Sequence, residues 1–117
     1  MKTHKNNELK GLIQELKEAS SKNKAPLWKR IAQDLEKPTR NKRVVNIYKL
    51  DKHSKDNDVI IVPGKVLGTG DLNHKINVAA VNFSEEAQRK ISSKGKVMTI
   101  KELLKTNPDG KGIKILG

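Results

Sequence analysis

Two short apolar runs, with a glycine-rich segment between them, constrain the fold of this chain more than any other feature. The first run, residues 59–62, is too short for a helix and is followed at once by Pro63, so it predicts a buried strand that ends there. The second run, residues 76–83, is mostly β-branched or apolar and predicts a second strand. The chain therefore has to pass from one strand to the other through the glycine-rich segment.

That segment, from Gly64 to Lys75, is predicted to be a loop suited to a phosphate-rich partner. Its glycines permit positive φ angles and a close approach of another backbone, while lysine and histidine side chains supply donors. It holds one carboxylate, Asp71, and no cysteine, so it does not suit an obvious reaction. A purely structural role, in which the glycines only turn the chain between strands, is compatible with RNA contact.

The strongly positive net charge of the chain indicates which class of partner it binds. The chain has 117 residues, enough for a single domain with a modest core, and 25 Lys and Arg against 13 Asp and Glu give a net charge of +12. Such an excess indicates a polyanion, either nucleic acid or an anionic membrane surface, and an acidic protein partner stays open as an alternative. No apolar run approaches the roughly 20 residues that span a bilayer, and the N-terminus lacks the apolar segment of a signal peptide, so we expect a cytoplasmic protein without a membrane partner.

Residues 1–37 are predicted to form an N-terminal helical hairpin. We expect residues 1–6 to be disordered or to need a partner, and a helix over residues 8–20, capped by Asn6 or Asn7. A polar linker, SSKNK, leads to a second helix that begins near Pro26 and stops before Pro38. Its inner stripe comprises Trp28, Ile31, Ala32 and Leu35.

Residues 38–117 are predicted to form an α/β body, so that the whole chain, residues 1–117, is one compact α/β domain. Asn46 is expected to cap a short helix with Ile47 and Leu50 inward, and Ser84 to start another. Thr99 and Glu102 form a capping box, and residues 112–117 end the chain as a strand. The alternation of strand and helix after residue 76 indicates crossover connections.

The residue patterns give no support for catalysis, a metal or a cofactor. His4, His53 and His74 lack metal-ligand spacing, and the absence of cysteine excludes thiolate sites. Residues 64–70 match neither the Walker pattern nor G-x-G-x-x-G, so no small-molecule substrate is expected. With so few aromatics, base stacking is a poor primary mechanism, and Trp28 and Tyr48 are interpreted as core residues.

Several segments together carry a resemblance to a known family. The run VPGKVLGTGDLNHK is followed by INVAAVNFSEEAQRKI, preceded by KPTRNKRVVNIYKL, and the chain ends in GKGIKILG. In these segments the chain resembles large-subunit ribosomal protein eighteen-e, in its compact archaeal form, a family related to bacterial large-subunit ribosomal protein fifteen. The resemblance implies a non-enzymatic, structural protein of the ribosome that binds large-subunit rRNA beside neighbouring ribosomal proteins. It also implies a fold of irregular strand-strand-helix turns.

The resemblance, together with charge, also suggests which residues contact RNA. The family's basic segment and glycine loop match two stretches of this chain, and two lysines near the C-terminus are added on charge. The candidate residues are Lys37, Arg40, Lys42, Arg43, Gly64, Lys65, Gly68, Gly70, His74, Lys75, Lys111 and Lys114. Two alternatives from other classes stay open: a free-standing nucleic-acid chaperone, and a small enzyme acting on RNA, which the missing acid-base constellation disfavours.

Overall fold

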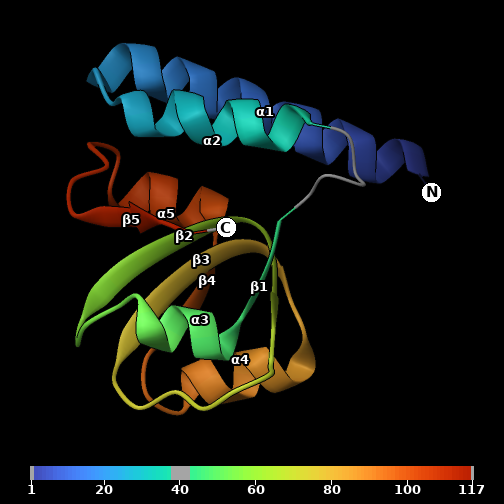
Figure 1. Ribbon diagram of the computed structural model, residues 1–117. Coiled ribbons are helices and arrows are strands. Elements are labelled where there is room, and N and C mark those ends of the chain that lie inside the picture. Colours follow the sequence, from blue (N-terminus) through green and yellow to red (C-terminus); the bar gives the residue numbers. More distant parts are fainter. Residues whose placement is uncertain (1, 38–42, 117) are drawn as a thin grey trace.

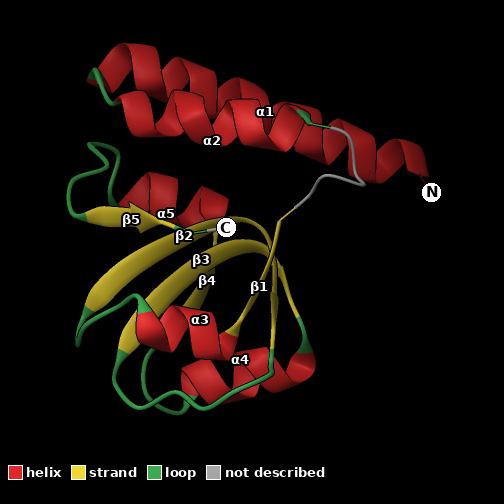
Figure 2. Cartoon of the chain, viewed as in Figure 1, coloured by secondary structure: helices red, strands yellow, loops and turns green. Residues whose placement is uncertain are grey.

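The computed structural model describes residues 2–37 and 43–116, and for residues 2–8 and 43 it describes the backbone alone. These residues form five helices and five strands (Figures 1 and 2). In chain order they are α1 (Lys2–Asn23), α2 (Pro26–Glu36), β1 (Arg43–Asn46), α3 (Ile47–Lys52), β2 (Asp58–Leu67), β3 (Ile76–Phe83), α4 (Glu85–Ser92), β4 (Lys96–Thr99), α5 (Ile100–Thr106) and β5 (Ile113–Ile115).

The five strands form one parallel sheet in the order β1-β2-β3-β4, with β5 also paired to β2. The first half of β2 pairs with β5, through Val59↔Ile113, and the second half pairs with β1, through Arg43↔Gly64. β1 and β5 therefore follow one another along the same edge of β2. Because parallel neighbours need crossover connections, helices lie between successive strands everywhere except between β2 and β3.

β2 continues through Pro63, so the prediction that Pro63 ends this strand is wrong. The pairing of β2 with β3 shifts register between Val62 and Lys65, at the point where β2 exchanges β5 for β1 as its other neighbour. Proline has no N–H to donate and is tolerated in sheets at such irregularities. Gly64 and Lys65, which were expected in the loop, consequently belong to β2, and the loop covers residues 68–75.

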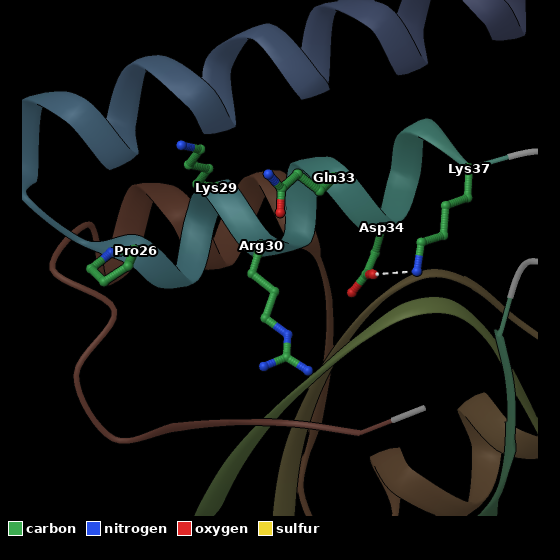
Figure 3. A pocket seen from close by; sticks show the side chains of 6 residues that line it. All are labelled: Pro26, Lys29, Arg30, Gln33, Asp34 and Lys37. Carbon is green, nitrogen blue, oxygen red and sulfur yellow. Dashed lines mark ion pairs between the residues drawn. The ribbon is translucent and has the colours of Figure 1, made fainter.

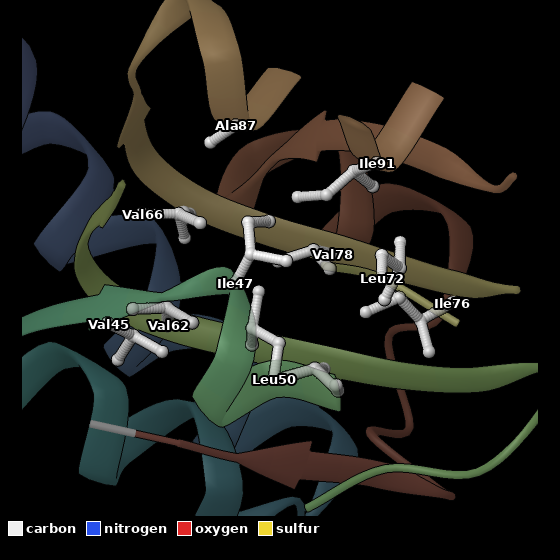
Figure 4. Packing of buried hydrophobic residues seen from close by; sticks show 12 residues of the cluster. Val45, Ile47, Leu50, Val62, Val66, Leu72, Ile76, Val78, Ala87 and Ile91 are labelled. Carbon is white, nitrogen blue, oxygen red and sulfur yellow. The ribbon is translucent and has the colours of Figure 1, made fainter. Parts of the chain in front are cut away.

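Helices cover both faces of the sheet, and alternate residues of the central strands feed two cores. Ile60 and Val62 of β2 face the core beneath α3 and α4, which Figure 4 shows, whereas Ile61 faces the core beneath α1, α2 and α5. In Figure 1, α1 and α2 lie together on one side of the sheet and α3 and α4 on the other. The predicted compact α/β domain with an N-terminal helical hairpin is confirmed.

The helix boundaries agree with the local signals in most places. Ser84 caps α4 by accepting a hydrogen bond from Ala87 N at 3.2 Å, and the capping box of Thr99 and Glu102 is present. Asn46 occupies the cap position of α3, but its side chain makes no capping hydrogen bond. The predicted inner stripe of α2 is buried as expected.

α1 is longer than predicted at both ends. It begins at Lys2, whereas residues 1–6 were expected to be disordered or to need a partner for order, and it ends at Asn23, so most of the predicted SSKNK linker is helical. No proline or glycine interrupts residues 2–10, and asparagine costs a helix interior only a few tenths of a kcal/mol, so the local cap signal is overridden. Lys24 closes the helix with φ of 51°, leaving a two-residue turn before Pro26.

The two aromatic residues interpreted as core have opposite environments. Trp28 is fully buried, and its indole Nε1 donates a hydrogen bond to Pro108 O at 2.8 Å. Tyr48 is 57% exposed, so the prediction that it belongs to the core is wrong. α3 buries Ile47 and Leu50 instead, and Tyr48, between them in sequence, points away from that face.

Candidate nucleic-acid interface

The loop of residues 68–75 provides the crossover between β2 and β3 that helices provide elsewhere. It leaves the end of β2, passes α3 and α4, and returns to the start of β3. Leu72 is 7% exposed and lies in the core beneath these helices with Ile76 and Leu50 (Figure 4). The loop is therefore a packed part of the fold.

Gly68 allows this loop to lie directly against α4. A Cβ atom at Gly68 would lie 2.7 Å from Glu86 Cβ and Cγ. Lys90 Nζ donates to Gly68 O at 2.7 Å and to Gly70 O at 2.6 Å, and it also pairs with Glu86 at 3.0 Å. The hydrogen bond and charge of Lys90 hold the pKa of Glu86 below its usual value. The first part of the loop is thus fixed by α4.

His74 and Asn73 fix the second part of the loop to α3. Asp51 Oδ1 accepts a hydrogen bond from Asn73 N at 2.8 Å, and Asp51 Oδ2 accepts one from Asn73 Nδ2 at 3.0 Å. His74 Nδ1 lies 3.3 Å from Asp51 Oδ1, and His74 Nε2 lies 2.6 Å from Ser54 Oγ. The His74 side chain is 19% exposed and is engaged by its own protein on both ring nitrogens.

Ser54, His74 and Asp51 contact one another in the manner of a hydrolase nucleophile, base and orienting carboxylate. In a hydrolase the serine hydroxyl donates its hydrogen bond to the histidine, but here it donates to a backbone carbonyl. Ser54 Oγ lies 2.5 Å from Leu50 O, and because a carbonyl oxygen can only accept, the serine must donate to it. Ser54 then receives a hydrogen bond from His74 Nε2 and has no hydrogen to give to a base. The three residues form a latch that joins the loop to α3.

We expect Asp51→Ala to lower the free energy of unfolding at pH 7 by about 1–2 kcal/mol, because it leaves Asn73 without its acceptors. The backbone hydrogen bond from Asn73 is the main cause that lowers the pKa of Asp51. Stability from a lowered carboxyl pKa is present at neutral pH and is lost as pH falls below about 4. Urea unfolding at pH 7 and pH 3 measures both effects, and the variant should lose less stability than the parent between the two pH values.

Asp71→Ala is the matched control, since Asp71 is an exposed carboxylate in the loop that Asp51 binds. It should change stability by less than about 0.5 kcal/mol. Equal effects of the two substitutions would contradict the latch.

Several predicted cations lie along the side of β2 that pairs with β5 and then with β1, which we call the shared edge of β2. Lys114 of β5 is opposite Ile60, and Arg43 of β1 is opposite Gly64, roughly 13 Å further along the strand. Lys65 pairs in register with Val44 and is exposed, as is Lys111 in the turn before β5. Lys114 is also held by Asp58 at 3.0 Å, and the pKa of Asp58 is lowered by hydrogen bonds from Lys55 N and Lys114.

The outer face of α2 adds Lys29 and Arg30 to the predicted candidate Lys37. Lys29, Arg30, Gln33 and Lys37 line a shallow hollow of about 510 Å³ together with Pro26 and Asp34 (Figure 3). Lys37 Nζ lies 3.3 Å from Asp34 Oδ1. The apolar stripe of α2 could have revealed Lys29 and Arg30, because residues opposite a buried helix face must point outward.

The structure thus separates the predicted site residues into three groups. Lys37 caps the C-terminal end of α2, and the shared edge of β2 or the turn beside it holds Arg43, Gly64, Lys65, Lys111 and Lys114. Gly68, Gly70 and His74 are engaged in holding the loop. Lys75 is exposed at the other end of the loop, with its backbone N–H donated to Asp56 Oδ1 at 3.1 Å. Arg40 and Lys42 lie outside the described residues.

Within the described ranges, no three or more His, Cys, Asp or Glu residues are grouped so that they could hold a metal ion. None of the helices described is both long and apolar enough to cross a membrane.

Comparison with known proteins decides the family. A family model described as "Ribosomal proteins 50S-L15, 50S-L18e, 60S-L27A" matches residues 13–99. The chain belongs to this family. Among its eL18 members, the protein named large ribosomal subunit protein eL18 from Methanoregula boonei is 48% identical over 112 residues, covering 95% of this chain and 93% of that protein. The namesake from Archaeoglobus fulgidus is 47% identical, covering 90% and 91%, and that from Sulfurisphaera tokodaii is 44% identical, covering 90% of each.

The match confirms the resemblance to the eighteen-e proteins in their archaeal form. The family model's match to residues 13–99 includes the second half of α1, the whole of α2 and the loop of residues 68–75. Because the eL18 family consists of ribosomal proteins, the prediction that the chain is not an enzyme is also confirmed.

Proposed function

We propose that this eL18-family chain is a structural constituent of the large ribosomal subunit that binds and organises large-subunit rRNA. The observation that supports it most is the placement of free cations on a rigid body. Lys65, Lys75 and Lys111 are exposed, and none of them pairs with a carboxylate of the described residues. With a net charge of +12, such side chains are available to neutralise phosphates.

The proposed mechanism is architectural. Cations on α2, on the shared edge of β2 and on the loop lie on different sides of one packed domain, so they can contact several rRNA helices at once. The sheet and its two cores fix the relative positions of those contacts. Recognition is mainly of RNA shape, through phosphates and 2′-hydroxyl groups. The large-subunit rRNA and neighbouring ribosomal proteins are the partners.

The predicted residues take two kinds of role in this proposal. Phosphate contacts come from the cations, which are Lys37, Arg40, Lys42, Arg43, Lys65, Lys75, Lys111 and Lys114. Gly64, Gly68, Gly70 and His74 act by shaping the backbone that carries them, since Gly68 and His74 are engaged inside the protein. The glycine-rich stretch therefore supports RNA binding by holding the backbone in the conformation that positions the lysines.

Affinity for purified archaeal large-subunit rRNA should fall steeply with salt, because each phosphate contact on a duplex contributes a slope of about −0.9 in a log–log plot. Six contacts would weaken binding roughly a thousandfold between 50 and 200 mM salt. Filter binding at stepped salt measures the slope, with an unrelated duplex RNA of equal length as competitor. Equal affinity for the competitor would favour the nucleic-acid chaperone, which shares the charge but needs no defined site.

A further inference from the structure

Tyr48 is an aromatic residue that is exposed on the surface of the fold. Of the three aromatic side chains, Trp28 is fully buried and Phe83 packs against the core beneath α3 and α4, whereas Tyr48 is 57% exposed. The Tyr48 hydroxyl has no hydrogen-bond partner among the described residues. Aromatic side chains carry a large apolar area, so an exposed ring without a partner among the described residues is available to a partner outside the chain.

The backbone of Tyr48 is nevertheless held firmly. Tyr48 N donates to Thr69 O at 3.0 Å, and Gly70, with φ of +108°, lies so close that a Cβ there would be 2.6 Å from Tyr48 Cβ and from Tyr48 N. Ile47 and Leu50 anchor α3 in the core (Figure 4). The ring therefore projects from a fixed base, and a partner that covers it would meet little cost in ordering the backbone.

The charges around Tyr48 favour a nucleotide over a protein as the partner. Lys49 and Lys52 are exposed on the same short helix, and Lys52 lies one turn from Tyr48. The nearest carboxylate along α3, Asp51, is engaged by Asn73 and His74. A base can stack on the ring while the lysines bind its phosphates, whereas the buried centres of protein interfaces are depleted in lysine.

Tyr48 is also separate from the other strongly exposed apolar residue near it in sequence. Val44 alternates in β1 with Val45, which is buried in the core beneath α3, so Val44 faces the opposite side of the sheet. Tyr48 and Val44 do not make one apolar patch, which is what a protein partner would need.

We propose that Tyr48 is a stacking platform for one unpaired base of large-subunit rRNA, with Lys49 and Lys52 on the flanking phosphates. This inference rests on the proposed function and adds a local contact to recognition by shape. It also gives Gly70 a definite role, because only a residue without Cβ lets the loop press on the Tyr48 backbone and fix the platform.

The test compares three variants in filter binding to large-subunit rRNA of Methanococcus maripaludis, whose eL18 protein is 47% identical to this chain. Tyr48→Ala and Tyr48→Leu should weaken binding by about fivefold to a hundredfold, whereas Tyr48→Phe should stay within about twofold. The slope of affinity against salt should not change in any of them, since no phosphate contact is lost. Unchanged urea unfolding midpoints verify that the variants fold.

A second readout uses the fact that Tyr48 is the only tyrosine. Nitration by tetranitromethane should modify Tyr48 in the free protein and should be blocked when the rRNA is bound. Full affinity in Tyr48→Leu, or a ring that stays reactive in the complex, would overturn the stacking inference and leave the proposed function intact. Failure of the parent protein to bind the rRNA would overturn the proposed function itself.

Discussion

Replacing Gly95 with alanine should destabilise the protein by about 3 kcal/mol or more, because the added Cβ atom would clash with backbone atoms that cannot easily move. A Cβ atom at Gly95 would lie 1.7 Å from Ile76 O and 2.8 Å from Ile76 C, which are backbone atoms. Ile76 begins β3 and is fully buried, so the start of the central sheet would have to move. Urea unfolding followed by circular dichroism measures the change.

Gly11→Ala provides the matched control for that substitution. Gly11 lies within α1, is exposed, and has no atom within 4 Å of the position that a Cβ would occupy. Alanine is favoured over glycine in a helix interior, so Gly11→Ala should raise stability by up to about 1 kcal/mol. Two alanine substitutions with effects of the same sign would contradict the close approach at Gly95.

Trp28→Ala should cost about 3–5 kcal/mol, the usual loss when a buried aromatic side chain is removed. Trp28 fills the core between α2 and the sheet, and its indole N–H donates to Pro108 O, in the turn that follows α5. The substitution removes both the packing of the indole ring and its hydrogen bond from the hairpin to the body. Thermal unfolding, with hydrogen exchange across α1 and α2, should show the loss concentrated in the hairpin.

Trp28→Phe separates the two contributions. It keeps much of the apolar volume but leaves Pro108 O without its donor, so we expect a smaller loss of about 1–2 kcal/mol from the hydrogen bond, with some added loss from packing. A Trp28→Ala variant as stable as the parent would mean that the hairpin does not pack on the sheet as described.

The features predicted correctly from the sequence are those set by short-range chemistry. The stripe of Trp28, Ile31 and Leu35 follows helical periodicity, and Ser84 and the Thr99–Glu102 box satisfy N–H groups within three residues of themselves. These signals do not depend on what the rest of the chain does, so the sequence alone contains them.

The features predicted wrongly, or not at all, depend on distant neighbours. Pro63 lies within β2 because β5 gives way to β1 beside it, and both strands are far away in the sequence. Asp51 accepts a hydrogen bond from Asn73 N across 22 positions, and Tyr48 is exposed because Ile47 and Leu50 take the buried face of a very short helix. Neither the exchange of β5 for β1 nor the contact of Asp51 with Asn73 leaves a local pattern, whereas the exposure of Tyr48 follows from the same spacing that predicts Ile47 and Leu50 inward.

The candidate RNA-binding residues came chiefly from the family resemblance, and the structure divides them by environment. Lys65 and Lys75 are exposed, whereas His74 is occupied by Asp51 and Ser54. Helical periodicity could have added Lys29 and Arg30, because the buried stripe of α2 already fixes its outer face. It could not have revealed that His74 is occupied inside the protein.

Sedimentation of the protein from a cell lysate distinguishes a ribosomal constituent from a free nucleic-acid-binding protein. An affinity-tagged form of this chain is followed through sucrose gradients prepared at increasing salt. We expect it to travel with the large ribosomal subunit at low and moderate salt and to leave it only at high salt, as phosphate contacts are screened. A protein that stays at the top of the gradient at every salt concentration would contradict the architectural role.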